Sequence, residues 1–300
     1  MNKQDFDVLV YVNDCSQIDF EEAGRILFKS DIEIESAYRT LVEEGFVDGS
    51  TLTDLGKNYL QTHKVDNAII LAAGMSTRFV PLNFEKPKGL LEINGEPLIE
   101  RQIKQLREKR IQEIVIVVGH MKEQFDYLVD KYGVILVPTY DYIEKNNHAS
   151  VYAARNYLKN TIITSSDLYF SENIFQTYAY DAYYCSIYIS GKTAERGIET
   201  DGDDRIIKTM YGDKCYDTWV TLGYAFFSER FSNNFLDIMK REIMLPETAN
   251  KFWADIQDAH LEELFMYVKR CDANLIHEFD SLEELREFDN KYVYDSGSRI

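Results

Sequence analysis

From residue 65 onward, short apolar segments alternate with amphipathic ones, and this alternation constrains the fold more than any other feature of the sequence. There are four apolar segments: residues 67–71, 113–118, 134–138 and 161–164. Between them apolar residues recur at helical spacing, as in residues 97–110. Apolar runs without polar alternation indicate strands that are buried on both faces. We therefore predict an α/β fold with a mostly parallel central sheet, in which ligands bind at the carboxyl ends of the strands.

Residues 1–63 follow another pattern, that of several short helices. Helical spacing covers three segments: residues 5–12, 20–28 and 31–44. Asp31 is the expected N-cap of the third helix, and Gly45 is its expected end. The change of pattern predicts two domains, residues 1–63 and residues 64–300.

The segment EGFVDGSTLTDLGKNYL completes the first domain. Phe46 and Val47 are strand-like, a glycine-containing turn follows, and Thr53 is placed to cap a helix. This order resembles the wing and following helix of a winged-helix domain, and the resemblance covers residues 1–63 only. Such a domain would ordinarily suggest DNA binding.

Charge opposes contact with nucleic acid. The whole chain has a net charge of −18, and residues 1–64 carry 13 acidic against 6 basic residues, a net of −7. The helix expected to read a duplex, DIEIESAYRTLVEEG, has one arginine among five acidic residues. Proteins that bind a duplex place cations against its phosphates. We expect this domain to make protein contacts instead, as a homodimer face, another protein interface or an intramolecular lid.

The composition fits a folded protein of the cytoplasm. Apolar residues make up 45% of the chain, and the four cysteines form no CxxC pair, as is usual for free thiols in a reducing compartment. The start of the sequence lacks the apolar stretch of a signal peptide, and no segment approaches the roughly 18 apolar residues of a membrane span. We expect a cytoplasmic protein without membrane insertion.

The stretch LAAGMSTRF, residues 71–79, leads out of the first predicted strand through mostly small side chains. Such a loop lets the backbone approach a ligand, and the helix expected after it would offer free N–H groups and a positive dipole end to phosphates. One such dipole contributes only about 0.3–1 kcal/mol, so a triphosphate also needs cations, which Arg78, Lys86 and Lys88 supply. The predicted nucleotide-binding backbone is Leu71, Ala72, Ala73, Gly74 and Met75.

LAAGMSTRF and the later EKPKGLLEINGEPLIERQI resemble the signature of the nucleotidyltransferase superfamily. Four further stretches narrow the resemblance: IVVGHMKEQFDYLVDKYGV, residues 146–150, KFWADIQD and IHEFDSLEEL. They are similar to the bacterial CTP:phosphocholine cytidylyltransferases, over roughly residues 65–290. The resemblance implies a Rossmann-like nucleotidyltransferase fold and transfer of CMP from CTP to a small phosphorylated alcohol, with release of pyrophosphate.

The resemblance also implies roles for single residues. Arg78 would hold the departing β- and γ-phosphates, and Lys88 would lie between the acceptor phosphate and the α-phosphate. Such a reaction depends mainly on positioning and on neutralising charge. Asn146 and Asn147 would touch the nucleotide or the acceptor; capping the following helix is their alternative role. Lys86 is either a third site cation or a surface residue.

Mg²⁺ is the expected cofactor, because two cations cannot balance a triphosphate and a second phosphate. This ion prefers one or two carboxylates together with waters and substrate oxygens. Asp167 ends a predicted strand, and Glu278 and Asp280 alternate along another, so that both point to one side. All three match metal-binding acids of the family. Helix capping is the alternative for Asp167 and Asp280.

Phosphocholine is the first expected acceptor. Its quaternary ammonium binds aromatic faces, at about 0.5–2 kcal/mol for each contact. Phe252, Trp253 and Tyr267 match aromatic positions of the choline-specific family. Where that family carries an acid after the tryptophan, direct alignment places Ala254, and the next residue, Asp255, is the candidate acid. Packing in the core is the alternative for these aromatic residues.

Arg196 departs from the choline pattern. It stands in KTAERGIETDGDDRI, where an aromatic residue of the family is expected, and its charge would repel a trimethylammonium group. Trp219 is a candidate to supply the aromatic side of the acceptor site that Arg196 does not provide. An arginine suits a phosphonate, a carboxylate or a sugar hydroxyl, so aminoethylphosphonate, phosphoethanolamine and a sugar 1-phosphate are alternative acceptors.

Two rival hypotheses belong to other classes. One is a winged-helix regulator whose transferase domain only senses a nucleotide. The other is a transferase for another nucleotide or acceptor, including the molybdenum-cofactor type, which shares LAAGxSxR.

Overall fold

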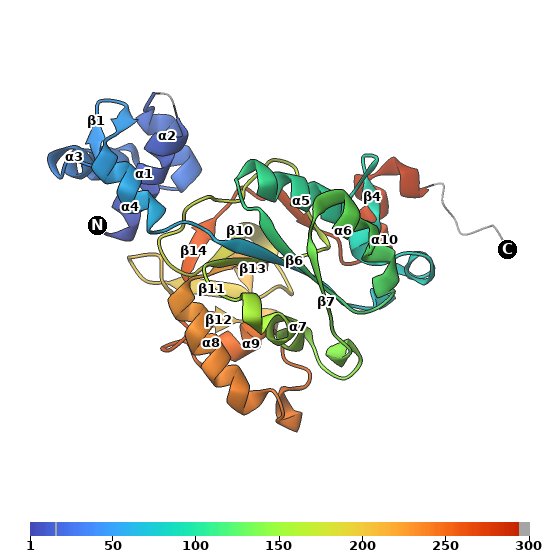
Figure 1. Cartoon of the computed structure of the whole chain (residues 1–300). Helices are drawn as coiled ribbons and strands as arrows, with labels where there is room; N and C mark the ends of the chain where they lie inside the picture. Colours follow the sequence, from blue (N-terminus) through green and yellow to red (C-terminus); the bar gives the residue numbers. More distant parts are fainter. Residues whose placement is uncertain (16, 294–300) are drawn as a thin grey trace.

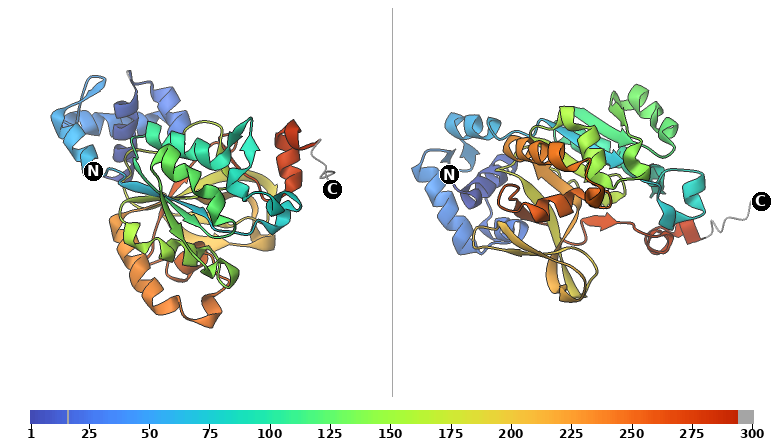
Figure 2. Two further views of the ribbon diagram at one scale, coloured as in Figure 1. Left: turned by 45° about the vertical axis from the view of Figure 1, so that its right-hand side comes forward. Right: turned by 90° about the horizontal axis from the view of Figure 1, so that it is seen from below.

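The computed structural model describes residues 1–15 and 17–293. A small helical part at the N-terminus adjoins a larger α/β part built on one nine-stranded sheet (Figure 1). Figures 1 and 2 place the N-terminal part at one end of the molecule and α10 (Leu282–Phe288) at the other. Within the described residues, no helix is both long and apolar enough to cross a bilayer.

The N-terminal part contains the elements α1 (Lys3–Asp14), α2 (Phe20–Leu27), α3 (Asp31–Glu43), β1 (Val47–Asp48), β2 (Thr51–Leu52) and α4 (Asp54–Gln61). Its helices bury one shared core, which includes Phe6, Leu9, Ile34 and Leu41. The two short strands pair as an antiparallel hairpin. This order of elements is the one expected for residues 1–63, and its assignment as a winged-helix domain stays a prediction.

The N-cap of α3 differs from the prediction. Ser30 has an extended backbone and accepts a hydrogen bond from the N–H of Glu33, whose carboxylate accepts one from the N–H of Ser30. This capping box satisfies two backbone donors at once, whereas Asp31 is already inside the helix. Ser30 is therefore the cap, and the assignment of Asp31 was wrong by one residue.

The large sheet has two halves. Its strands are β3 (Asn67–Ala72), β6 (Glu113–Val118), β7 (Ile135–Pro138), β8 (Thr161–Ser165), β10 (Tyr183–Lys192), β11 (Gly197–Thr200), β12 (Ile206–Met210), β13 (Tyr216–Phe227) and β14 (Tyr267–Arg270). Strand β3 pairs in parallel with both β6 and β8, and β6 pairs in parallel with β7, as predicted. The long strand β13 joins the second half by pairing antiparallel with β8, β10 and β11. The order is β12-β11-β13-β8-β3-β6-β7; off this path, β10 pairs with β13, and β14 pairs with β10.

Helices cover both faces of the parallel half (Figure 1). They are α5 (Leu98–Glu108) and α6 (Tyr127–Tyr132) on one face, and α7 (Asn147–Ala153), α8 (Glu229–Glu242) and α9 (Trp253–Ala259) on the other. Successive residues of β3 point to opposite faces, so Ile70 packs with α5 while Ile69 packs with α7 to α9. Burial on both faces explains the uninterrupted apolar runs.

Besides the hairpin of the N-terminal part, two short antiparallel pairs lie outside the large sheet. They are β4 (Glu92–Ile93) with β5 (Glu96–Pro97), and β9 (Leu168–Phe170) with β15 (Ile276–Glu278). The second pair places residues 276–278 beside the segment that follows β8. This pairing joins segments more than one hundred residues apart, and it brings Glu278 close to Asp167.

The segment after β3 is not the α-helix that was expected. Three single-turn 3₁₀ segments, at residues 77–79, 82–84 and 88–90, fill the space before α5. Pro81 and Pro87 interrupt this stretch, and each lacks a backbone donor and disfavours helical conformation in the residue before it. The phosphate-binding role expected of a helix dipole therefore has no structural basis here.

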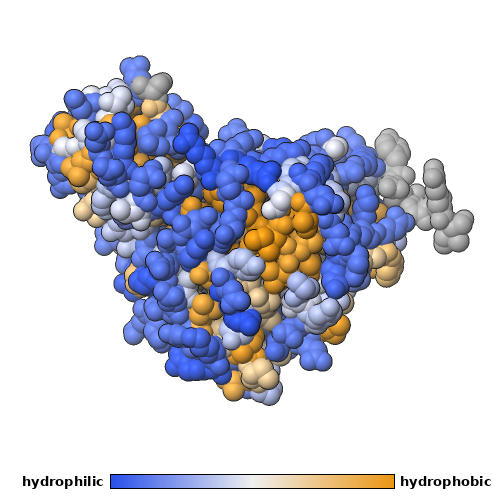
Figure 3. All heavy atoms as spheres, viewed as in Figure 1, coloured by the Kyte–Doolittle hydropathy of each residue, from blue (hydrophilic) through white to orange (hydrophobic). Residues whose placement is uncertain are grey.

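The N-terminal part docks on the antiparallel half of the sheet. The ring of Phe28 meets Trp219 edge to face, with 5.4 Å between centroids. Lys29 Nζ lies 2.9 Å from a carboxylate oxygen of Asp204, which also pairs with Arg270. Figure 3 shows a mostly polar visible face, on which apolar residues gather where β6 and β7 lie.

Candidate active site

A cavity of about 490 Å³ opens where the strands β3 and β8 end. Fifteen of the predicted site residues line it: Leu71, Ala72, Ala73, Gly74, Arg78, Lys88, Asn146, Asn147, Asp167, Arg196, Phe252, Trp253, Asp255, Glu278 and Asp280. They come from segments that are more than two hundred residues apart in sequence. The carboxyl edge of a parallel sheet is where such loops converge.

Gly74 leaves open space beside the loop that follows β3. A Cβ placed on it would meet no described protein atom within 4 Å, and its φ is not positive. Neither packing nor backbone conformation therefore requires a glycine here. A ligand that lies against the backbone would require a glycine, because any side chain would occupy its space. The neighbouring Leu71 and Ala73 are fixed, because their carbonyls accept hydrogen bonds from the N–H groups of Ser166 and His120.

Cations and carboxylates alternate on the floor of the cavity. Lys88 Nζ lies 2.8 Å from Asp167 Oδ2 and 3.6 Å from Asp280 Oδ1. Arg78 donates a hydrogen bond of 2.8 Å to the same Asp280 oxygen. The Lys88 side chain is only 10% exposed, whereas that of Arg78 is 68% exposed and is free to turn toward a ligand. Lys86 is an exposed residue 4.0 Å from Glu92 and does not line the cavity.

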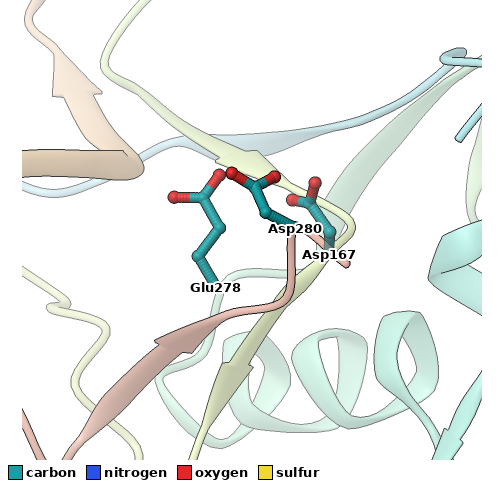
Figure 4. Close-up of side chains that lie close together, drawn as sticks. All are labelled: Asp167, Glu278 and Asp280. Carbon is teal, nitrogen blue, oxygen red and sulfur yellow. The ribbon is translucent and has the colours of Figure 1, made fainter. Parts of the chain in front are cut away.

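Asp167, Glu278 and Asp280 form a compact acidic cluster. One oxygen of each lies within 4.8 Å of the others, and Figure 4 shows the three carboxylates converging from the β8–β9 loop and from the segment around β15. Burial and the charges of Asp167 and Asp280 raise the pKa of Glu278 to about 8. The buried Asp167 Oδ1 accepts no hydrogen bond from any described residue.

This cluster fits a divalent cation. Three crowded carboxylates repel one another, and an orphaned buried oxygen is costly unless something positive coordinates it. Hard oxygen donors of this kind suit Mg²⁺. Residues Asp167, Glu278 and Asp280 would hold the ion.

The alternative capping roles do not apply to these acids. Asp167 lies in the turn between β8 and β9, and no helix follows it. Asp280 lies two residues beyond the end of β15, not within a strand, and Ser281 is the N-cap of α10. The expected alternation of Glu278 and Asp280 along one strand was therefore wrong, although both side chains reach the cluster.

Asn146 and Asn147 bind protein groups. Asn146 caps α7 by accepting from the N–H of Asn147, and its amide donates to the Asn250 carbonyl at 3.2 Å. Asn147 Oδ1 accepts from the N–H of Trp253 at 2.9 Å. The start of α7 thus holds the segment that carries the aromatic wall of the cavity.

Arg196 is neutralised within the protein. It is 7% exposed and pairs with Asp258 through two nitrogens, while the same guanidinium donates to Gln257 at 2.8 Å. It also lies over the ring of Tyr184, 5.3 Å from the centroid. Because its charge is paired, the predicted repulsion of a cationic acceptor loses its basis.

The aromatic wall is only partly available to a ligand. Trp253 is 3% exposed and stacks on Tyr184 with 4.7 Å between centroids. Phe252 and Tyr211 are 51% and 48% exposed, and the Tyr211 hydroxyl donates to Asp255 and Asp258. Trp219 does not line the cavity, since it contacts Phe28 of the N-terminal part.

Two predicted residues lie elsewhere. Met75 lines an adjoining hollow of about 480 Å³ that shares Arg78 and Lys88 with the main cavity. Tyr267 lies at the start of β14, where its ring meets Tyr180 and faces away from this site. Pairing of β14 with β10 carries Tyr267 to the side of the N-terminal part, so its placement in the acceptor site is corrected.

The sequence prediction missed several cavity residues: Tyr142, Lys145, Tyr184, Glu195 and Tyr211. Lys145 directly precedes the two asparagines and offered a local signal. Tyr184 and Tyr211 lie on or beside the antiparallel strands, which no sequence motif marked.

Comparison with known proteins identifies the family. The MobA-like NTP transferase domain matches residues 68–197. The 2-aminoethylphosphonate cytidylyltransferase of Lancefieldella rimae is 37% identical over 76% of this chain and 94% of its own length. The choline-phosphate cytidylyltransferase of Streptococcus pneumoniae is 34% identical over 74% of this chain and 96% of its own. The chain belongs to the bacterial cytidylyltransferases.

A solved structure agrees with this membership. The CTP:phosphocholine cytidylyltransferase from Streptococcus pneumoniae superimposes with a TM-score of 0.71 at 32% identity, over 75% of this chain and 98% of that one. The predicted nucleotidyltransferase fold and enzyme class of this cytidylyltransferase are therefore confirmed. The two relatives carry different acceptors in their names, so the acceptor must be argued from the site.

Proposed function

We propose that this enzyme transfers CMP from CTP to a small phosphonate or phosphate that carries an ammonium group, primary or quaternary, in a Mg²⁺-dependent reaction. 2-Aminoethylphosphonate is the first candidate acceptor, and phosphocholine is the second. One observation carries the proposal: a single cavity has the cations Arg78 and Lys88 and the acidic cluster on its floor, and an aromatic, acidic wall beside them.

The floor supplies what nucleotidyl transfer requires. An acceptor oxygen forms a bond to the α-phosphorus of CTP while the bond from that phosphorus to the bridging oxygen breaks, and pyrophosphate leaves. Lys88 is buried beside the cluster and can neutralise charge on the reacting phosphates, while the exposed Arg78 can turn from Asp280 to the leaving group. The bare backbone around Gly74 gives the nucleotide room.

Mg²⁺ would be held by the cluster of Asp167, Glu278 and Asp280. When bound, such an ion neutralises phosphate charge and helps to align the two substrates.

The wall favours a primary ammonium over a trimethylammonium group. The faces of Trp253 and Tyr184 are engaged in stacking, which reduces the aromatic surface that a choline head needs. Asp255 and Glu195 line the same cavity and can accept hydrogen bonds from –NH₃⁺. Partial burial and the charges of Asp280 and Glu284 raise the pKa of Glu195, so a cation beside it would be stabilising. The rings of Phe252 and Tyr211 are exposed and could contact the trimethylammonium group of choline, so phosphocholine is the second candidate acceptor.

A pyrophosphate-release screen tests the proposal. CTP, UTP, dTTP, ATP and GTP would each be paired with 2-aminoethylphosphonate, phosphoethanolamine, phosphocholine and sugar 1-phosphates. We expect the highest kcat/KM for CTP with 2-aminoethylphosphonate. A higher value for phosphocholine would reverse the order of acceptors, and no release with any CTP pair would refute the proposed activity.

Asp167→Asn tests the metal site. Loss of one anionic ligand should lower kcat about 10- to 100-fold and shift the Mg²⁺ activation curve to higher concentration. Activity would be measured as a function of free Mg²⁺. A variant with wild-type activity and an unchanged activation curve would remove Asp167 from the site.

A further inference from the structure

The turn that carries Asp167 is held by one buried amide outside the cavity. Only Ser166 and Asp167 separate the end of β8 from the start of β9. Gln102, on α5, has no exposed surface, and its Nε2 donates to the Ser165 carbonyl at 2.9 Å and to the Leu168 carbonyl at 2.8 Å. These two hydrogen bonds therefore link the residues on either side of the turn to the same side chain.

The orientation of the amide is also determined. Gln102 Oε1 accepts a hydrogen bond of 3.1 Å from the hydroxyl of Thr164, another residue without exposed surface. An amide turned over would set an acceptor against two carbonyls and a donor against the hydroxyl. Thr164 thus directs both N–H groups of Gln102 to the turn.

The rest of the turn has little freedom to move. A Cβ on Gly89 would lie 2.7 Å from Ser166 Cβ, and a Cβ on Gly223 would lie 2.6 Å from Ser165 Oγ, so other backbone segments pack directly against both serines. The N–H of Ser166 donates to the Leu71 carbonyl at 3.0 Å. Because Ser165, Ser166 and Leu168 are held in place, the position of the Asp167 carboxylate is restricted as well.

We propose that Gln102 is a positioning residue for the metal cluster: it fixes the β8–β9 turn so that Asp167 meets Glu278 and Asp280. Gln102 itself does not line the cavity, so it would act through the turn and not by direct contact with a ligand. The inference rests on the proposed function, since it presumes that the cluster binds a divalent cation. Residues that orient a metal ligand in this way commonly contribute 10- to 100-fold to metal affinity or activity.

Mn²⁺ binding to the full-length protein, followed by the electron paramagnetic resonance of free Mn²⁺, is the direct test. Gln102→Met keeps the side-chain volume and removes all three hydrogen bonds. We expect its dissociation constant for Mn²⁺ to rise about tenfold or more, with a lower kcat and a nearly unchanged KM for CTP. Gln105→Met is the matched control: Gln105 is also buried on the same helix but donates to the Phe170 carbonyl, beyond the turn.

A second variant covers the case in which Gln102→Met does not fold. Thr164→Val preserves shape and removes only the hydroxyl that orients the amide, and a rise in the dissociation constant of about threefold is expected, on the order of half the free energy of a tenfold change. Equal Mn²⁺ affinity in the wild type and the folded variants would overturn the role proposed for Gln102 but not the proposed function. Variants that all fail to fold, with Gln105→Met folded, would also overturn it, since Gln102 would then serve the fold. Wild-type protein that neither binds Mn²⁺ nor releases pyrophosphate would refute the proposed function as well.

Discussion

At the scale of single residues, Lys88 shows how the charge balance of the site arises. It is nearly buried, lies between two carboxylates, and has its ammonium 4.8 Å from the centroid of the Phe79 ring. Its partners Asp167 and Asp280 belong to the acidic cluster, so its charge is held where reacting phosphates would meet that cluster. Low exposure makes such a charge more effective than one at the surface.

Lys88→Met should lower kcat about 10²- to 10³-fold, because the variant keeps the volume of the side chain and loses the charge that stabilises the transferring phosphate. Pyrophosphate release under saturating substrates measures this. Lys86→Met, two residues away on the surface, is the control and should retain wild-type turnover. Equal kcat in the two variants would show that Lys88 has no part in the chemistry.

At the scale of elements, the start of α7 and the segment before α9 behave as one unit. The N–H of Asn146 donates to the Ala249 carbonyl, and His148 Nδ1 lies 2.6 Å from the Lys251 carbonyl oxygen. The N–H of Trp253 completes the set by donating to Asn147. The pair of asparagines therefore shapes the aromatic wall.

Asn147→Ala should raise the KM for the acceptor more than the KM for CTP, because it releases the N–H of Trp253 and loosens the wall. We expect an increase of roughly tenfold for the acceptor, about 1.4 kcal/mol. Steady-state kinetics with each substrate varied in turn would separate the two effects. Asn147→Asp keeps the acceptor oxygen and should restore most of the loss. A change confined to the KM for CTP would favour the nucleotide contact instead.

At the scale of the whole molecule, the N-terminal part is fastened to the sheet through a buried ion pair. Asp204 is 8% exposed and pairs with Lys29 across the junction and with Arg270 on β14. Burial alone would raise the pKa of Asp204, but its bonds to Arg270 and Lys29 lower the pKa below its usual value. At the same junction Phe28 packs against Trp219. Trp219 belongs to β13, which also contains the cavity residue Thr221.

Asp204→Asn should lower the free energy of unfolding by about 2 kcal/mol at pH 7, because two partly buried cations lose their anionic partner. A carboxyl with a depressed native pKa stabilises above its unfolded pKa of about 3.9 and loses that contribution as pH falls through the native pKa. The difference between wild type and variant should therefore shrink as pH falls below about 4.

Urea unfolding at several pH values measures this difference. Asp203→Asn, an exposed neighbour, is the control and should leave stability unchanged. A difference between wild type and Asp204→Asn that grows toward low pH would contradict the assigned role of the ion pair.

Local sequence was enough to determine the parallel half of the fold and the floor of the cavity. Apolar runs marked β3, β6, β7 and β8, since strands buried on both faces have no polar alternation. Residues 71–74 and Arg78 followed from one short motif, and Lys88 followed from the stretch that begins six residues after it. Asp167 was found because it ends a predicted strand, whereas Glu278 and Asp280 were found from their alternating spacing and their match to the family.

Only the tertiary structure decided the character of the acceptor wall. The charge of Arg196 is cancelled by Asp258, more than sixty residues later, and Tyr184 of β10 stacks on Trp253 of α9. Tyr267 is carried away by the pairing of β14 with β10. Sequence specifies which charge or ring a residue carries, whereas partners brought together by long-range pairing decide whether that charge or ring is available to a ligand.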